Sequence, residues 1–190
     1  MSYIVGIPKE IKENEKRVSM TPQEVKILVE RNLQVYVEKD AGSGAGFPDD
    51  DYQKLGAIIC NSAQEVFDNA NVIVKVKEPL ESEYALINDK HIVYSFFHFA
   101  SCLPLLKAMV DSKATCIAYE TIQTFEDPVK FPVLAPMSVI AGEQAMINAH
   151  KYMEKEDLVC DDIDVVVVGA GNVGRAAAFK AHELGYKSIH

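Results

Sequence analysis

The sequence has no apolar run that approaches the roughly 20 residues of a membrane-spanning helix, so no membrane segment or membrane partner is expected. Met1, Ser2 and Tyr3 lead directly into an apolar segment, without a signal-peptide pattern. The four cysteines are scattered and form no C-x-x-C pair, which is typical of reduced structural thiols. The five histidines form no H-x-x-x-H motif and pair with no cysteine. We therefore expect a cytoplasmic protein that holds no metal.

Basic residues are also in short supply: 19 lysines and arginines face 28 acidic residues, for a net charge of −9. This balance argues against nucleic acid or an anionic membrane as the main partner. It leaves open a local cationic pocket for a small anion. The 48% apolar content supports a sizeable core and excludes bulk disorder, and 190 residues suit one domain with an appendage.

Apolar strand patterns alternate with helical patterns along the first two thirds of the chain. The strands are expected at residues 3–7, 33–37, 57–60, 72–77, 91–99 and 115–120. This alternation predicts an α/β fold with a doubly wound, mostly parallel sheet of the Rossmann-like or flavodoxin-like type. We expect a substrate domain over residues 1–136, a linker helix over 137–160, and a truncated start of a second Rossmann domain over 161–190.

A glycine-rich turn follows four valines near the end of the sequence. Residues 165–168 predict a strand buried on both faces, and Gly169, Gly171 and Gly174 form G-x-G-x-x-G before a helix that ends at Gly185. In a dinucleotide site the first glycine permits a tight turn, the second lets the backbone approach a pyrophosphate, and the third lets helix pack on strand. A plain turn between strand and helix is the alternative. The acidic ribose-binding residue expected about 20 positions later is absent, so only the first βα unit is present.

Polar residues stand where three of the expected strands end: Lys77, His98 and Glu120. Parallel strands end at one edge of the sheet, and ligands of open α/β sheets bind at that edge. Lys77 is either a ligand-binding residue or a solvated strand end, and His98 is either a proton handler or a satisfied core residue. Arg17 follows a nearly all-charged segment, at the point where the chain turns back toward the core.

Several of these segments together resemble alanine dehydrogenase and the N-terminal part of the α subunit of the proton-translocating nicotinamide nucleotide transhydrogenase. The resemblance covers the whole chain in order. The blocks that carry it are Gly6-Ile7-Pro8-Lys9-Glu10, Arg17-Val18 with Thr21-Pro22, Lys75-Val76-Lys77-Glu78-Pro79, Ala118-Tyr119-Glu120-Thr121 and Leu134-Ala135-Pro136-Met137-Ser138.

The resemblance implies NAD-dependent oxidative deamination of L-alanine to pyruvate and ammonia. Unpaired strand edges of the partial second domain favour self-association, so we also expect a homo-oligomer. It implies that Arg17 and Lys77 bind the substrate carboxylate and carbonyl, and that His98 handles the proton. Arginine holds carboxylates bidentately, a lysine stabilises charge on a carbonyl oxygen, and an imidazole titrates near neutral pH. Glu120 is expected to support these residues without touching the substrate. Ser138 is expected on the cofactor side, together with the three glycines.

The sequence also departs from the family pattern. The family has Met-Ser-Glu-Val-Ala-Gly-Arg where this chain has Met137-Ser138-Val139-Ile140-Ala141-Gly142-Glu143. A dehydrogenase for another amino acid, such as one of the lysine or opine type, is therefore an alternative. A fragment of the transhydrogenase α subunit and a non-catalytic binding module are further alternatives. Because half of the cofactor site is missing, we expect little turnover by these 190 residues alone.

Overall fold

The computed structural model describes residues 2–126, 130–158 and 163–190. The chain packs as two compact units, Met1–Glu120 and Thr121–His190. The long helix expected to be a linker packs within the second unit. The functional limits expected from the sequence stay a prediction, and residues 159–162 of the expected boundary lie outside the described part.

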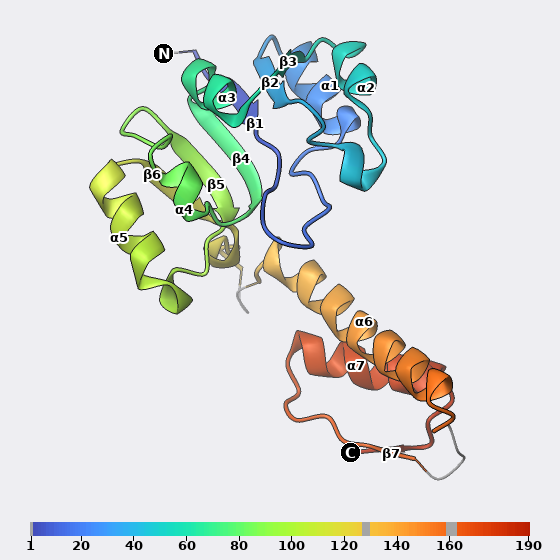
Figure 1. Cartoon of the computed structure of the whole chain (residues 1–190). Helices are drawn as coiled ribbons and strands as arrows, with labels where there is room; N and C mark the ends of the chain where they lie inside the picture. The colour runs from blue at the N-terminus through green and yellow to red at the C-terminus, as the bar shows by residue number, and fades with distance from the viewer. Residues whose placement is uncertain (1, 127–129, 159–162) are drawn as a thin grey trace. The chain divides into compact units, whose positions relative to one another are not determined.

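The first unit is built on a six-stranded sheet in which every pair of neighbours is parallel (Figure 1). The strand order is β3-β2-β1-β4-β5-β6, which confirms the doubly wound α/β prediction. The strands are β1 (Ile4–Ile7), β2 (Gln34–Glu38), β3 (Ile58–Cys60), β4 (Val72–Lys77), β5 (Ile92–Phe96) and β6 (Thr115–Ala118).

Helices between the strands cover both faces of this sheet. One apolar cluster joins β1 and β2 to Val25 and Tyr52, and a second joins β4 and β5 to Phe67, Leu105 and Met109. The helices are α1 (Pro22–Glu30), α2 (Asp49–Gln53), α3 (Ala63–Asn69), α4 (Glu81–Tyr84) and α5 (Leu103–Ser112), with 3-10 turns η1 (Ser43–Ala45), η2 (Phe99–Ser101) and η3 (Tyr119–Thr121). Burial on both faces keeps the central strands apolar.

Two strands end earlier than the sequence predicts. The strand expected over 91–99 ends at Phe96, and His98 follows in a left-handed conformation with φ of 51°. The strand expected over 115–120 ends at Ala118, and Glu120 lies in the 3-10 turn η3. Both polar residues therefore lie just beyond the sheet edge, where the backbone has already left the strand.

The second unit contains α6 (Leu134–Lys155), α7 (Asn172–Glu183) and the short parallel strands β7 (Asp164–Val165) and β8 (Ser188–Ile189). The long helix begins three residues before the predicted start because Pro136 is tolerated in a first turn. Gly142 lets α6 and α7 approach closely, since a Cβ there would lie 2.2 Å from the carbonyl oxygen of Val173.

The prediction of a strand over residues 165–168, buried on both faces, is wrong for this structure. The strand β7 ends at Val165, and the side chains of Val166 and Val168 are 70% and 97% exposed. The only strand that pairs with β7 in the described residues is the two-residue β8, so these valines have no sheet neighbour to bury them. The helix predicted after the glycines is confirmed as α7.

Candidate functional site

The strand order reverses between β1 and β4, and ligands of open α/β sheets bind in the crevice at the carboxyl ends of such strands. The two strands pair only near their starts, through Val5 with Val72 and Gly6 with Ile73. Beyond Ile73, β4 is contacted by side chains from the segment after β1 instead of by β1 itself. The hydroxyl of Ser19 donates to the carbonyl of Val74 at 2.7 Å. The segment after β1 therefore lies along this end of β4.

Arg17 comes from that segment, and Glu15 orients its guanidinium. Arg17 Nε donates to Glu15 Oε1 at 2.8 Å, and Arg17 Nη2 donates to Glu15 Oε2 at 2.6 Å. The hydrogen bond from Arg17 lowers the pKa of the Glu15 carboxyl to about 2. Because this bidentate pair uses one edge of the guanidinium, the remaining N–H groups of Arg17 can bind a second carboxylate.

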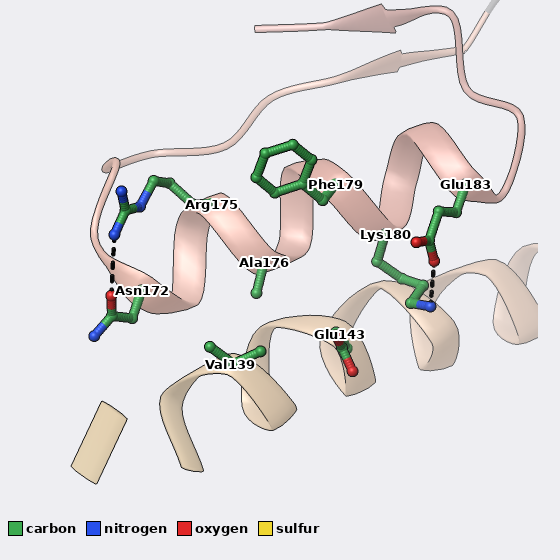
Figure 2. Close-up of a pocket in the computed structure, with 8 residues that line it drawn as sticks. All are labelled: Val139, Glu143, Asn172, Arg175, Ala176, Phe179, Lys180 and Glu183. Carbon is green, nitrogen blue, oxygen red and sulfur yellow. Dashed lines mark hydrogen bonds and ion pairs between the residues drawn. The ribbon is translucent and has the colours of Figure 1, made fainter. Parts of the chain in front are cut away.

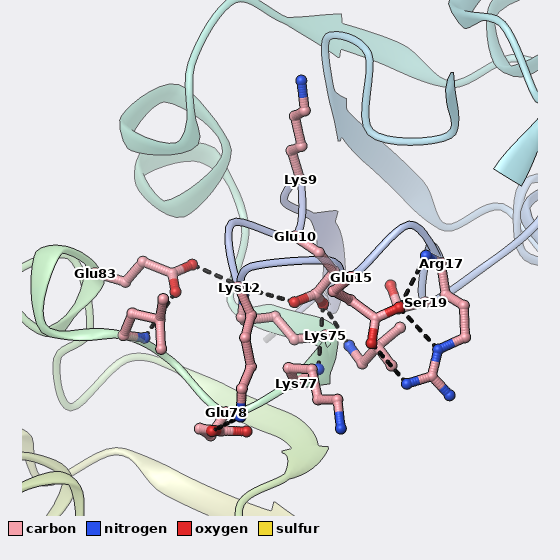
Figure 3. A network of polar contacts seen from close by, with 12 residues as sticks. Lys9, Glu10, Lys12, Glu15, Arg17, Ser19, Lys75, Lys77, Glu78 and Glu83 are labelled. Atoms are coloured by element: carbon pink, nitrogen blue, oxygen red, sulfur yellow. Dashed lines mark hydrogen bonds and ion pairs between the residues drawn. The ribbon is translucent and has the colours of Figure 1, made fainter. Parts of the chain in front are cut away.

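Lys77 lies at the carboxyl end of β4, and its charge also acts on Glu15. Four cations of this region are Lys12, Arg17, Lys75 and Lys77; the first three form ion pairs with Glu78, with Glu15, and with Glu10 and Glu83. Among the described residues, Lys77 is the one member of this group without a carboxylate within 4.0 Å. Its ammonium is therefore available to an anionic ligand. Figure 3 shows Arg17, Glu15 and Lys77 gathered together, whereas Lys9 points away from them.

His98 lies beyond the end of β5, the strand next to β4. Its backbone N–H donates to Glu120 Oε1 at 2.6 Å, which holds the residue in its left-handed conformation. Its ring stacks on the ring of Phe96, with the two centroids 6.1 Å apart. Phe96 is in turn the register partner of Lys77 in the ladder between β4 and β5. The side chain of His98 is exposed, so the alternative of a satisfied core histidine is wrong. Non-glycine residues held in this backbone region occur often at functional sites.

Arg17 and Lys77 thus both act on Glu15, and His98 follows the end of the adjacent strand β5. Glu120 reaches His98 from the loop after β6, and its Oε2 is buried without a hydrogen-bond partner in the described part of the chain. The roles of these side chains in binding and chemistry stay predictions.

Sequence reasoning missed Lys75. Its side chain is fully buried, and its ammonium lies 2.9 Å from Glu83 Oε1 and 3.4 Å from Glu10 Oε2. The alternating pattern of β4 places Lys75 and Lys77 on one face without distinguishing them. The available clue was the position of Lys75 inside a strand covered on both sides, because a lysine there requires a buried anionic partner.

The expected cofactor residues meet in the second unit. Ser138, Gly169, Gly171 and Gly174 line one pocket of about 520 Å³ between α6 and the glycine turn. Gly169 has a φ of 103°, a conformation that favours glycine, and a Cβ on Gly174 would lie 2.0 Å from the Gly169 carbonyl oxygen. A Cβ on Gly171 would meet nothing within 4 Å, which leaves room above its backbone.

A second pocket of about 250 Å³ lies along α6 and α7 in the same unit. Two of its lining residues, Val139 and Glu143, stand at positions where the sequence departs from the family pattern (Figure 2). Two of its cations have internal partners: Lys180 binds Glu183 at 2.5 Å and Arg175 binds Asn172 at 3.1 Å.

Two classes of feature are absent from the described part of the chain. It contains no group of three or more His, Cys, Asp or Glu side chains that could hold a metal ion. None of its helices has the length and apolarity needed to cross a bilayer. Cys60, Cys102 and Cys116 are free thiols, and burial raises the pKa of Cys60 to about 11. Cys160 lies outside the described residues.

Comparison with known proteins identifies the family. The family described as "Alanine dehydrogenase/PNT, N-terminal domain" matches residues 6–141. The chain belongs to this family. It is 42% identical to the alanine dehydrogenase of Methanococcus maripaludis, over 97% of the chain and 52% of that relative.

Solved structures of the alanine dehydrogenase/PNT family agree with this assignment. An L-alanine dehydrogenase matches with a TM-score of 0.87 and 35% identity, over 97% of the chain and 54% of that structure. A transhydrogenase from Sinorhizobium meliloti matches with a TM-score of 0.80 and 29% identity, over 96% and 57%. The chain therefore spans about half the length of these relatives.

Proposed function

We propose that this chain forms the substrate-binding part of an NAD-dependent alanine dehydrogenase, with the opening unit of the NAD site. The observation that carries the proposal is the Lys77 ammonium, which has no carboxylate partner among the described residues and acts with Arg17 on Glu15, at the strand-order reversal of the sheet. A 2-oxo acid such as pyruvate offers a carboxylate and a carbonyl, which suit a guanidinium and an ammonium. The names of the relatives support alanine and pyruvate as the substrate pair.

In this proposal Arg17 binds the substrate carboxylate, and Glu15 fixes the guanidinium that does so. Lys77 stabilises the negative charge that develops on the carbonyl oxygen. His98, exposed at the strand end, exchanges the proton released as the imine forms and hydrolyses. Glu120 holds the backbone of His98 and so places its ring over Phe96. Expected self-association and a cytoplasmic location stay predictions.

NAD is proposed to bind at the glycine turn. Gly171 leaves its backbone open to a pyrophosphate, and the first turn of α7 presents free N–H groups toward the same place. Ser138 lines the same pocket and offers a hydroxyl. The bound cofactor would accept the hydride from alanine.

Calorimetric titration of the chain with pyruvate tests the substrate assignment. We expect saturable binding that Lys77→Ala weakens by about tenfold or more, because a charge-assisted hydrogen bond contributes about 1.5–3 kcal/mol. Lys9→Ala is the matched control, since Lys9 is exposed and points away from Arg17 and Lys77 (Figure 3). Absence of pyruvate binding by the unchanged chain, or an equal loss in both variants, would contradict the proposal.

A further inference from the structure

The buried carboxylate of Glu10 has contacts that the proposed roles do not use. The Glu10 side chain is 3% exposed, and one of its oxygens, Oε2, lies 3.4 Å from the ammonium of Lys75. Its other oxygen, Oε1, accepts the backbone N–H of Val76 at 2.6 Å and that of Lys77 at 3.4 Å. A side chain from the segment after β1 therefore holds the backbone of β4 at Lys77.

These hydrogen bonds take the place of the pairing between β1 and β4, which ends early. Because β1 stops pairing with β4 after Gly6 and Ile73, the N–H groups further along β4 lose their ladder partner on that side. An unpaired buried N–H costs about 1–3 kcal/mol. Glu10 supplies the acceptor, so β4 stays hydrogen-bonded beyond the point where its pairing with β1 ends.

The other edge of β4 is irregular over the same residues. Val74 pairs with Tyr94 and Lys77 pairs with Phe96, so β4 has one more residue than β5 over this interval. An extra residue of this kind bends the strand and re-aims the side chains around it. The direction of Lys77 is thus set by a bulge on one edge and by Glu10 on the other.

Glu83 provides a natural comparison. It also binds Lys75, at 2.9 Å, and its side chain is 4% exposed. Its second oxygen, however, accepts the N–H of Leu80 at 2.9 Å, away from Lys77. Both carboxylates share the buried cation, but only Glu10 touches the backbone that carries Lys77 (Figure 3).

We propose that Glu10 is a positioning residue for Lys77: its carboxylate fixes the bulged end of β4 so that the Lys77 ammonium faces the substrate anion. This proposal rests on the proposed function for its effect on binding. The position of the Glu10 oxygen matters more for this role than its charge. Lys75 compensates the charge that makes Glu10 a strong acceptor in a buried place.

Three variants separate geometry from charge. Glu10→Gln keeps the reach of the acceptor and removes the charge. Glu10→Asp keeps the charge and shortens the reach by one methylene. Glu83→Gln is the matched control, because it perturbs the same ion-pair network without touching Val76 or Lys77. Pyruvate affinity by calorimetry and the backbone amide resonances of Val76 and Lys77 are measured in each.

We expect Glu10→Asp to weaken pyruvate binding by about tenfold, because the loss of a hydrogen bond costs about 1–1.5 kcal/mol. Glu10→Gln and Glu83→Gln should stay within about threefold of the unchanged chain. The amide proton shifts of Val76 and Lys77 should change most in Glu10→Asp. The proposal is overturned if Glu10→Asp binds as well as the unchanged chain, or if Glu83→Gln loses as much affinity as Glu10→Asp.

The amide resonances keep this proposal distinct from the proposed function. If the unchanged chain binds no pyruvate, the function fails while the resonances still report on Glu10. Equal shifts of Val76 and Lys77 in Glu10→Asp and Glu83→Gln would then reject the positioning role. Larger shifts in Glu10→Asp would retain it.

Discussion

Replacement of Lys75 by methionine should strongly destabilise the first unit. The variant leaves the carboxylates of Glu10 and Glu83, which are 3% and 4% exposed, without the ammonium that they share. Removal of one partner from a buried ion pair costs about 3–5 kcal/mol. With a urea dependence of about 2 kcal/mol per molar, the unfolding midpoint should fall by about 2 M.

The pH dependence of this loss has a definite sign. Burial raises the pKa of Glu10 above its usual 4.5, and Lys75 opposes that rise, so the variant should raise the pKa of Glu10 further. A carboxyl whose folded pKa exceeds its unfolded value is destabilising at high pH. The penalty is relieved as the pH falls through the folded pKa. The loss should therefore be larger at about pH 8 than at about pH 5.5.

Tyrosine fluorescence during urea unfolding measures this loss, because the protein has no tryptophan and six of its eight tyrosines lie in the first unit. Lys77→Met is the control, with the same substitution on the same strand at a partly exposed position, and should cost less than about 1 kcal/mol. A cost below about 1 kcal/mol for Lys75→Met at about pH 8, or a cost that grows on acidification, would refute the reasoning.

Three further substitutions follow from the site. Glu15→Gln should lower stability by about 1 kcal/mol at neutral pH, a modest value because Arg17 is 45% exposed. Since the pKa of Glu15 is lowered from 4.5 to about 2, this stabilisation is complete above pH 4.5 and is lost as the pH falls through about 2, so the acid unfolding curves of the two proteins should converge only below that pH. Gly174→Ala should lower both the melting temperature and NADH binding, because its Cβ would lie 2.0 Å from the Gly169 carbonyl oxygen. Gly171→Ala should keep the melting temperature and lose NADH binding in a fluorescence titration; unchanged binding would contradict the cofactor site.

The sheet of the first unit could be predicted from the sequence because each strand is a short, mainly apolar run bounded by polar or helical segments. The topology follows once parallel strands alternate with helices. The strand ends at His98 and Glu120 could not be predicted, because the apolar pattern continues past the point where the backbone leaves the sheet. The valines at 166 and 168 were misjudged for a related reason: their composition suits a buried strand, but burial depends on neighbours that lie elsewhere in sequence.

The candidate site was predictable in its residue types and only partly in its geometry. Lys77 and His98 stand at the ends of strands expected from the sequence, and Arg17 stands where the chain turns back toward the core, but its role came from the resemblance. The partners of these residues come from distant segments: Glu10 meets Val76 across 66 positions, and Glu120 meets His98 across 22. Nothing local in the sequence indicates such pairings. The buried network around Lys75 therefore emerged only from the structure.

If Arg17, Lys77 and His98 bind one small anion, a pyruvate titration of the chain should move the amide resonances of all three residues. We expect their signals to shift together and to yield one dissociation constant, while the Lys9 signal stays unchanged. Shifts confined to one of the three residues, or three different dissociation constants, would contradict this expectation.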